Sequence, residues 1–321
     1  MDVVGVFMRN GVVGKTGASA KSCCSASDAR DAAMVADRLG IPFYSVDYER
    51  EFGSLVDHFA EEYRRGRTPN PCVLCNQQLK FGQMFSLADA VGATEVATGH
   101  YARIEDGRLR RARDLDKDQT YYLFGMDRGC LDRVRFPLGG LTKDEVRRKA
   151  RQAGLETADK PESMEICFVT SDSYRDVVAA RGGRGRAGAF VDEAGSELGE
   201  HDGIDGFTVG QRRGLPALGT PHYVKEIRAD SGEVVLCRRE GLLTRTAAVQ
   251  VTNWLVDPPR GALNAAVQIR ARSAPVPATI TPDEDGGPAL VEFHEPVSAV
   301  TPGQAAVVYD GDVVLGGGWL D

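Results

Sequence analysis

The spacing of apolar residues along the chain changes near residue 175, and this change is the sequence feature that most constrains the fold. Before that point, short apolar runs such as 3–8 and 41–46 alternate with segments whose apolar residues recur at helical spacing. Strand, helix and strand in this order predict a parallel sheet with helices on its faces. Beyond it, helical spacing fades and short β-type runs separated by turns continue to the C-terminus. We therefore expect an α/β domain with a parallel sheet over residues 1–175, a small β-rich central domain over 176–243 and a C-terminal β-barrel over 244–321.

Composition and charge exclude several classes of protein. The 321 residues are 42% hydrophobic and 26% charged, as in ordinary globular proteins. No apolar run approaches the roughly 20 residues that cross a bilayer, and no signal-peptide pattern is present, so we expect a cytoplasmic protein with no membrane partner. In that compartment the seven cysteines favour catalysis or metal binding over a disulfide framework. The net charge of −7 argues against a surface coated with nucleic acid but allows a local RNA-binding patch.

A proline-bracketed run that ends in two cysteines, Pro69-Asn70-Pro71-Cys72-Val73-Leu74-Cys75, is the most informative motif. The prolines stiffen a turn, and residues 76–91 then carry helical periodicity. We expect Cys75 near a helix N-terminus, where the macrodipole and unpaired backbone N–H groups favour thiolate. Cys167, far away in sequence, offers a second thiol. The pattern favours sulfur chemistry over a structural cross-link.

Other interpretations of these cysteines were weighed. A zinc site needs four ligands, commonly a second close pair, and the sequence offers none, so we expect no metal site of that kind. An iron–sulfur cluster held by Cys72, Cys75 and Cys167 stays open as an alternative.

The run 11–16 does not match a Walker A loop, because Arg9 stands where the first glycine is required. His100 directly follows a predicted strand end, where both a structural and a functional role stay open.

Basic residues gather in three short clusters. These clusters lie at 108–113, 147–151 and 181–186. Taken alone, each is typical of a solvated helix face or loop.

Segments spread along nearly the whole chain form a wider pattern, at residues 5–10, 66–71, 74–76, 98–103, 117–119, 165–168, 210–215 (Gly-Gln-Arg-Arg-Gly-Leu) and 301–305. In this order they resemble the bacterial tRNA-specific 2-thiouridylase family. The resemblance implies an adenine-nucleotide hydrolase-like first domain and a tRNA-binding C-terminal barrel. It implies ATP-dependent 2-thiolation of the wobble uridine of tRNA, by adenylation of the C2 oxygen and sulfur transfer from a persulfide.

The same resemblance assigns roles to residues. Cys75 would be the nucleophile and Cys167 the persulfide carrier, with a Cys75–Cys167 disulfide as a turnover state. ATP with Mg²⁺ would contact Met8 and Gly99, and a sulfur-donor protein would deliver the persulfide. The base, flipped out of its stack, would meet Asn70, Pro71 and Cys72. Positions that match tRNA contacts are His100, Lys117, Asp118, Gln119, Arg270, Ala271 and Gln304; relatives often have an aromatic residue where this chain has Ala271.

The start of the chain departs from the family pattern. Relatives open with a strand and a Ser-Gly-Gly-Val-Asp-Ser type loop that holds the ATP phosphates at a helix N-terminus. This sequence begins about where the second strand is expected, so we expect the true start to lie upstream. Two alternatives to the persulfide enzyme follow: a cluster-dependent tRNA sulfurtransferase, and an inactive tRNA-binding module.

Overall fold

The first half of the chain contains parallel strands, as predicted, but they form two separate pairs in the computed structural model. The structure describes residues 2–12, 26–160, 166–169, 173–283 and 287–321. β1 (Gly5–Arg9) pairs with β2 (Phe43–Asp47), and β3 (Val96–Ala97) pairs with β6 (Val134–Arg135), both in parallel. No strand among the described residues hydrogen-bonds to both β1 and β3, so the two pairs do not join into the single sheet that we expected.

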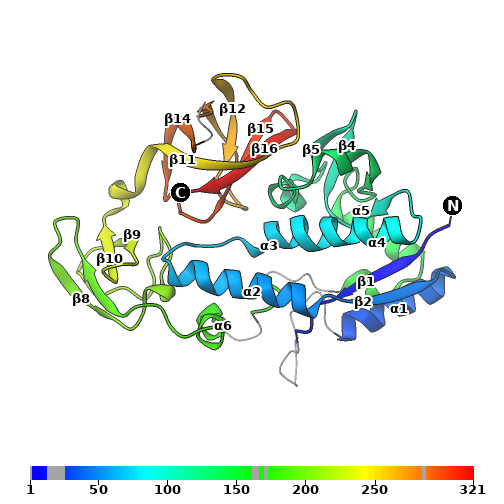
Figure 1. Cartoon of the computed structure of the whole chain (residues 1–321), viewed down its shortest axis with the longest axis horizontal. Coiled ribbons are helices and arrows are strands. Elements are labelled where there is room, and N and C mark those ends of the chain that lie inside the picture. The colour runs from blue at the N-terminus through cyan, green and yellow to red at the C-terminus, as the bar shows by residue number, and fades with distance from the viewer. Residues whose placement is uncertain (1, 13–25, 161–165, 170–172, 284–286) are drawn as a thin grey trace.

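Helices cover and connect these strands (Figure 1). α1 (Ala26–Leu39) contacts β1 and β2, and α2 (Glu49–Arg64) buries the apolar stripe that its periodicity predicted. A second helical stretch runs from Pro71 to Ala90 as α3 (Pro71–Leu74), the π-helical η1 (Cys75–Gln83) and α4 (Met84–Ala90). α5 (Lys143–Gln152) starts with a capping box formed by Thr142 and Glu145, and α6 (Tyr174–Ala180) packs on α2. The 3₁₀ turns of this half are η2 (Leu115–Lys117), η3 (Thr120–Tyr122), η4 (Arg128–Arg133) and η5 (Glu156–Asp159).

A four-stranded sheet forms the middle of the chain. It is built from β7 (Gly188–Val191), β8 (Glu197–His201), β9 (Tyr223–Arg228) and β10 (Glu233–Cys237), in the order β8-β7-β10-β9. Two 3₁₀ turns, η6 (Ile204–Gly206) and η7 (Arg239–Leu242), flank β9 and β10. Its own small core includes Phe190, Phe207 and Leu236.

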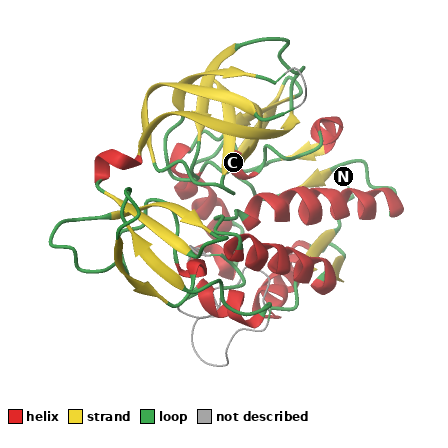
Figure 2. Cartoon of the chain, turned by 60° about the vertical axis from the view of Figure 1, so that its left-hand side comes forward, coloured by secondary structure: helices red, strands yellow, loops and turns green. Residues whose placement is uncertain are grey.

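The C-terminal part is a closed antiparallel barrel. Its strands are β11 (Leu243–Trp254), β12 (Leu263–Gln268), β13 (Val276–Thr281), β14 (Ala289–Ser298), β15 (Ala305–Asp310) and β16 (Val313–Leu320), and pairing of β11 with β16 closes it. The hairpin of β4 (Ala102–Glu105) and β5 (Arg108–Arg111) comes from the first half of the chain and extends this sheet by pairing with β16. Figure 2 shows the barrel and the four-stranded sheet as two groups of strands beside the helices.

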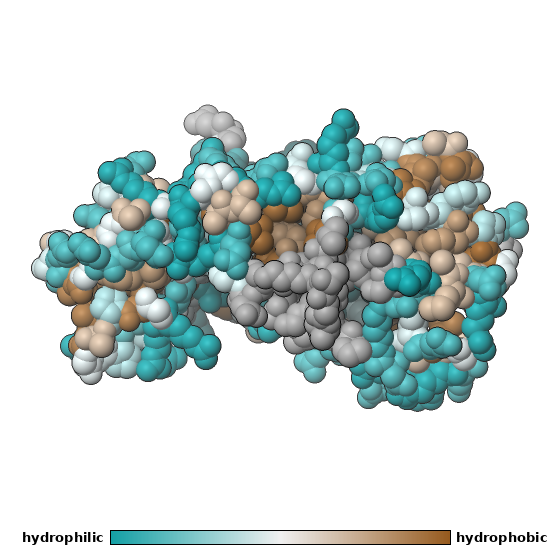
Figure 3. Space-filling view, turned by 90° about the horizontal axis from the view of Figure 1, so that it is seen from below, coloured by the Kyte–Doolittle hydropathy of each residue, from teal (hydrophilic) through white to brown (hydrophobic). Residues whose placement is uncertain are grey.

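The largest apolar core joins the first half of the chain to the barrel. It contains Phe85 of α4 and Tyr121 of η3 together with Val307 and Tyr309 of β15. Apolar residues also reach the surface at the end of the molecule that carries α1 and β2, where Met34 and Leu39 are exposed (Figure 3).

Candidate functional site

The helix that carries the cysteine motif begins earlier than its sequence predicted. Asn70 is the N-cap and Pro71 the first helical residue, so Cys72 lies in the first turn and Cys75 in the second. The backbone N–H of Cys75 is already bonded to carbonyl oxygens of Cys72 and Pro71. Because the macrodipole acts mainly on the first turn, the expectation that Cys75 sits at a helix N-terminus is wrong, and Cys72 holds that position.

Cys75 and Cys167 nevertheless share one environment. Both are partly buried and pack against the same apolar cluster, which α2 supplies with Phe52 and Phe59. No disulfide joins any of the described cysteines. Met8, the predicted ATP contact on β1, packs on this cluster too. Segments from three distant parts of the chain therefore meet on one face of α2.

Phe168 fixes the position of its neighbour Cys167, a role that sequence analysis missed. Its ring meets those of Phe52 and Phe59 edge-on, with centroids 5.8 and 5.0 Å apart. Such pairs contribute about 0.5–1.5 kcal/mol each beyond burial. The signal available in the sequence was only an aromatic residue next to a cysteine.

The residues just before the motif lie where the three parts of the chain meet. The N–H of Thr68 donates to the carbonyl of Pro302 at 2.8 Å, and Gln304 Nε2 donates to the carbonyl of Thr68 at 2.9 Å. The hydroxyl of Thr68 donates to that of Thr208, in the central part, at 3.3 Å. Gln304, predicted to contact tRNA, thus uses its amide to hold the segment that leads to Asn70 and Cys72.

Tyr121 and Tyr122 hydrogen-bond to two asparagines, Asn70 and Asn76, that flank the cysteine motif. Asn70 hydrogen-bonds to the hydroxyl of Tyr121, which itself donates to the carbonyl of Ala305 at 2.9 Å. Burial raises the pKa of Tyr121 above its usual range, so it stays a neutral donor. Asn76 Nδ2 donates to the carbonyl of Tyr122 at 3.1 Å. Asn70 itself is buried.

His100 is buried and neutral. Burial, and then the nearby charge of Lys80, lower its pKa to about 3. Lys80 Nζ lies 3.5 Å from Nε2 and can only donate, so Nε2 accepts and Nδ1 carries the proton toward the hydroxyl of Thr98 at 2.8 Å. Phe81 and Phe136 flank the ring. A contact between this ring and tRNA would require Lys80 or Thr98 to move.

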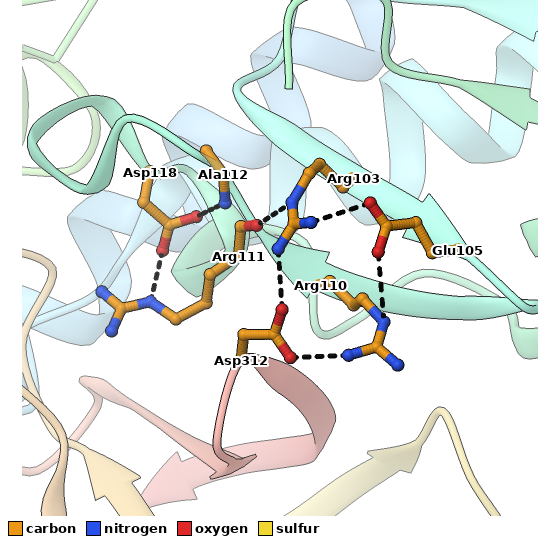
Figure 4. Close-up of polar contacts among 7 residues, drawn as sticks. All are labelled: Arg103, Glu105, Arg110, Arg111, Ala112, Asp118 and Asp312. Carbon is orange, nitrogen blue, oxygen red and sulfur yellow. Dashed lines mark hydrogen bonds and ion pairs between the residues drawn. The ribbon is translucent and has the colours of Figure 1, made fainter. Parts of the chain in front are cut away.

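Asp118 and Gln119 hold the β4–β5 hairpin and the loop after it. The carboxylate of Asp118 accepts from Arg111 Nε at 3.1 Å and from Ala112 N at 2.9 Å (Figure 4). It also accepts from Thr120 Oγ1 at 2.7 Å. Gln119 Oε1 accepts from the N–H of Tyr101 at 2.9 Å. Lys117 ends η2 just before them.

Asp312, in the turn between β15 and β16, completes this network from the barrel side (Figure 4). Arg103 and Arg110 donate to its two oxygens at 2.7 and 2.6 Å. Burial pulls the pKa of Asp312 upward, but the bonds from Arg110 and Arg103 outweigh it and leave the pKa lowered. The network therefore ties the hairpin to the barrel by charge as well as by strand pairing.

Arg270 also makes protein contacts, between the barrel and the central part. Its guanidinium donates to the carbonyls of Val209 at 3.2 Å and Ala299 at 2.9 Å. Burial lowers the pKa of Arg270. Ala271 is half-buried against the main core. The structure thus places Arg270 as a connector at the junction that also holds Thr68.

The predicted ATP contacts lie at the carboxyl ends of parallel strands. Met8 is the fourth residue of β1, and Gly99 is exposed two residues beyond β3. The run 13–16 and the adjacent pair Cys23 and Cys24 lie outside the described residues.

Two kinds of feature, metal-binding groups and membrane-spanning helices, are absent from the described residues. The described residues contain no group of three or more histidine, cysteine, aspartate or glutamate side chains that could hold a metal ion. None of the helices in this part of the chain has the length and apolar character of a membrane span.

Comparison with known proteins adds family-level information. Residues 1–171 match the model described as tRNA methyl transferase HUP domain, residues 175–238 the tRNA methyl transferase PRC-barrel domain, and residues 244–320 the aminomethyltransferase β-barrel domain. The predicted order of an α/β domain, a small β domain and a barrel is confirmed.

Relatives that are similar over most of this chain include tRNA-specific 2-thiouridylases. A tRNA-specific 2-thiouridylase of Geobacter metallireducens is 48% identical over 309 residues, which cover 94% of this chain and 83% of the relative. Those of Rhodopirellula baltica and Geotalea uraniireducens are each 45% identical, over 96% and 100% of this chain and 80% and 88% of the relatives.

Proposed function

Because the chain belongs to the tRNA-specific 2-thiouridylase family, we propose that it transfers sulfur to C2 of the wobble uridine of tRNA in an ATP-dependent reaction. The observation that carries this proposal is the placement of Cys75 and Cys167 on one apolar cluster, although 91 residues separate them in the chain. Met8 packs on the same cluster, so the expected nucleotide side of the site adjoins the sulfur side.

The two thiols would divide the chemistry. The C2 oxygen of uridine attacks the α-phosphorus of ATP and pyrophosphate leaves, so that the adenylated oxygen becomes a good leaving group. The outer sulfur of a persulfide on Cys167 then bonds to C2, and AMP departs. The thiolate of Cys75 attacks Sγ of Cys167, which breaks the S–S bond, leaves the outer sulfur on C2 and forms a Cys75–Cys167 disulfide.

The cycle needs two further supplies. Two electrons from a dithiol reductant reopen the disulfide, and a sulfur-donor protein reloads Cys167 with a persulfide. Mg²⁺ enters as the partner of the ATP phosphates, since carboxylates and phosphates are its usual ligands. Met8 and Gly99, at strand carboxyl ends, suit a nucleotide at that edge.

The junction that holds Thr68 would set the geometry of the base. Asn70, Pro71 and Cys72 follow Thr68 after one intervening proline, and Thr68 is hydrogen-bonded to Pro302 and Gln304 of the barrel segment and to Thr208 of the central part. A base flipped toward Cys72 would therefore be placed relative to all three parts of the chain at once.

Replacement of each cysteine tests the proposal. Cys75→Ser and Cys167→Ser are each expected to abolish 2-thiouridine formation, measured by mass spectrometry of nucleosides from a tRNA transcript incubated with ATP and a sulfur source. Cys130→Ser is the matched control, because Cys130 is also a partly buried cysteine but packs on a different core. It should retain activity.

Two results would count against the mechanism. Thiolation by either serine variant at the wild-type rate would exclude a two-cysteine transfer. A wild-type chain that binds tRNA but forms no 2-thiouridine would leave only a tRNA-binding function.

A further inference from the structure

The loop between η6 and β9 carries two arginines that the reaction above does not use. Arg212 and Arg213 are both exposed, in the Gly-Gln-Arg-Arg-Gly-Leu segment. In the described part of the chain neither guanidinium is paired with a carboxylate. By contrast, their neighbours Arg175 and Arg184 lie 2.7 and 3.6 Å from oxygens of Asp202.

The backbone of this loop is held in place by its own hydrogen bonds. Gln211 lies at its centre: Oε1 accepts from Thr208 N at 3.1 Å, and Nε2 donates to the carbonyls of Arg213 at 2.8 Å and Gly206 at 3.3 Å. The loop also exchanges backbone bonds with Val224 of β9. Since the backbone is already ordered, a ligand would have to order only the two arginine side chains.

The loop starts at the junction that holds the target-base segment. Thr208 contacts Thr68 through their hydroxyls at 3.3 Å, and Arg270 of the barrel segment donates to the carbonyl of Val209 at 3.2 Å. Arg212 follows Thr208 by four residues, which keeps its backbone within about 14 Å of that contact. The two arginines therefore lie on the surface close to the approach to Asn70 and Cys72.

The chemistry of this surface fits a polyanion better than a protein. Unpaired guanidinium groups bind phosphate through two parallel hydrogen bonds. Arg213 borders a cavity of about 480 Å³ whose wall also includes Arg175, Glu200 and Asp202. Arg175 and Asp202 pair with each other, and Arg212, which does not line this cavity, adds a second exposed guanidinium to the loop. None of the exposed large apolar side chains of the described chain lies in the loop, whereas the centre of a protein interface is usually apolar.

We propose that Arg212 and Arg213 bind backbone phosphates of tRNA and fix its register, so that the wobble uridine arrives at the segment containing Asn70 and Cys72. This inference rests on the proposed function, since it takes tRNA as the substrate. The contact carries no base specificity and acts on every tRNA substrate alike.

Salt dependence of tRNA binding tests the two contacts. Each phosphate contact contributes about 0.7–0.9 to the slope of log affinity against log salt. The double variant Arg212→Gln/Arg213→Gln should therefore lower this slope by about 1.4–1.8, measured by filter binding of a tRNA transcript between 50 and 200 mM KCl. At 50 mM KCl the double variant should bind tRNA at least about tenfold more weakly than wild type. This difference in affinity should fall about tenfold by 200 mM KCl.

Two controls isolate the cause. Arg260→Gln removes an exposed arginine that is likewise unpaired among the described residues, in the loop between β11 and β12, and should leave the slope unchanged. Arg212→Lys/Arg213→Lys keeps both charges and should retain the slope.

The outcomes separate this inference from the proposed function. Wild-type slope and affinity in the double glutamine variant would overturn the inference alone. Unchanged tRNA binding, with thiolation lost only when a donor protein rather than inorganic sulfide supplies sulfur, would assign the loop to a protein partner and also overturn it. A wild-type chain that binds no tRNA would overturn the proposed function itself.

Discussion

The substitution Asp118→Asn is expected to lower the free energy of unfolding by about 2–4 kcal/mol. The side chain of Asp118 is only 5% exposed, and its Oδ2 accepts from both Arg111 Nε and Thr120 Oγ1. In asparagine one of the two oxygens becomes an NH₂ group, which would face a donor in either orientation of the amide: Arg111 Nε on one side or the N–H of Ala112 on the other. A charge-assisted hydrogen bond contributes about 1.5–3 kcal/mol, and breaking a buried ion pair costs about 3–5 kcal/mol. The guanidinium of Arg111 remains 20% exposed and can recover some hydration, which sets the lower value.

Asp312→Asn provides the comparison. Asp312 makes two ion pairs, with Arg103 at 2.7 Å and Arg110 at 2.6 Å, both shorter than the 3.1 Å contact of Asp118. Distance alone would therefore predict the larger loss at Asp312. However, Asp312 is 43% exposed, and exposed pairs contribute only about 0.2–1 kcal/mol each. We expect a total loss of about 1 kcal/mol.

Urea unfolding followed by circular dichroism measures both losses as midpoint shifts at constant m value. A loss at Asp312 as large as that at Asp118 would refute the argument that burial decides. An unchanged midpoint for Asp118→Asn together with weaker tRNA binding would show that Asp118 contacts tRNA, as the family resemblance implies, and that its structural role is minor.

Two further predictions concern residues that support the site. His100, with its pKa lowered to about 3 from the usual 6.5, takes up a proton on unfolding, so stability is fully present above pH 6.5 and falls as the pH drops toward 3, by up to about 1.4 kcal/mol per pH unit. His100→Gln should flatten urea midpoints measured between pH 7 and pH 5, and an unchanged slope would contradict the burial argument. Gly303 has φ of +85°, and a Cβ there would lie 3.1 Å from the backbone N and O of Thr68. Gly303→Ala should therefore lower the free energy of unfolding by about 1–2 kcal/mol and slow thiolation. Gly311→Ala shares the positive φ but meets open space, so an equal loss of activity there would rule out the contact with Thr68 as the cause.

Local signals in the sequence were sufficient for several elements. The apolar spacing from Phe52 to Tyr63 gave the buried face of α2, and Thr142 with Glu145 gave the start of α5, since both depend on neighbours in the chain. The start of the cysteine helix was missed because Pro71 was assigned to a turn. Proline is also favoured at the first helical position, and Asn70 before it is a common N-cap, so the signal was present.

Contacts between distant segments had no local signal. The run of arginines at 108–113 is, taken alone, typical of a solvated cluster, yet Arg110 is paired with Asp312, 202 residues away in the chain. The hairpin of β4 and β5 likewise joins the barrel only in the folded chain. A run of basic residues does not show which guanidinium pairs with a remote carboxylate, as Arg110 does, and which stays available to bind phosphate, as we propose for Arg212.

The position of the two sulfurs depends on α2 more than on the helix that carries Cys75. Phe168 packs edge-on against Phe52 and Phe59 of α2, which anchors Cys167, and α2 also contacts α3 and η1, which carry Cys75. The helix N-terminus does not explain why Cys75 would be the attacking thiol, because the first turn contains Cys72 instead. What distinguishes Cys75 from Cys72 is that Cys75 packs on the same apolar cluster as Cys167, whereas Cys72 is exposed. In the proposed reaction this shared packing on α2 favours Cys75 over Cys72 as the thiol that attacks Cys167, and Cys72 would border the incoming base.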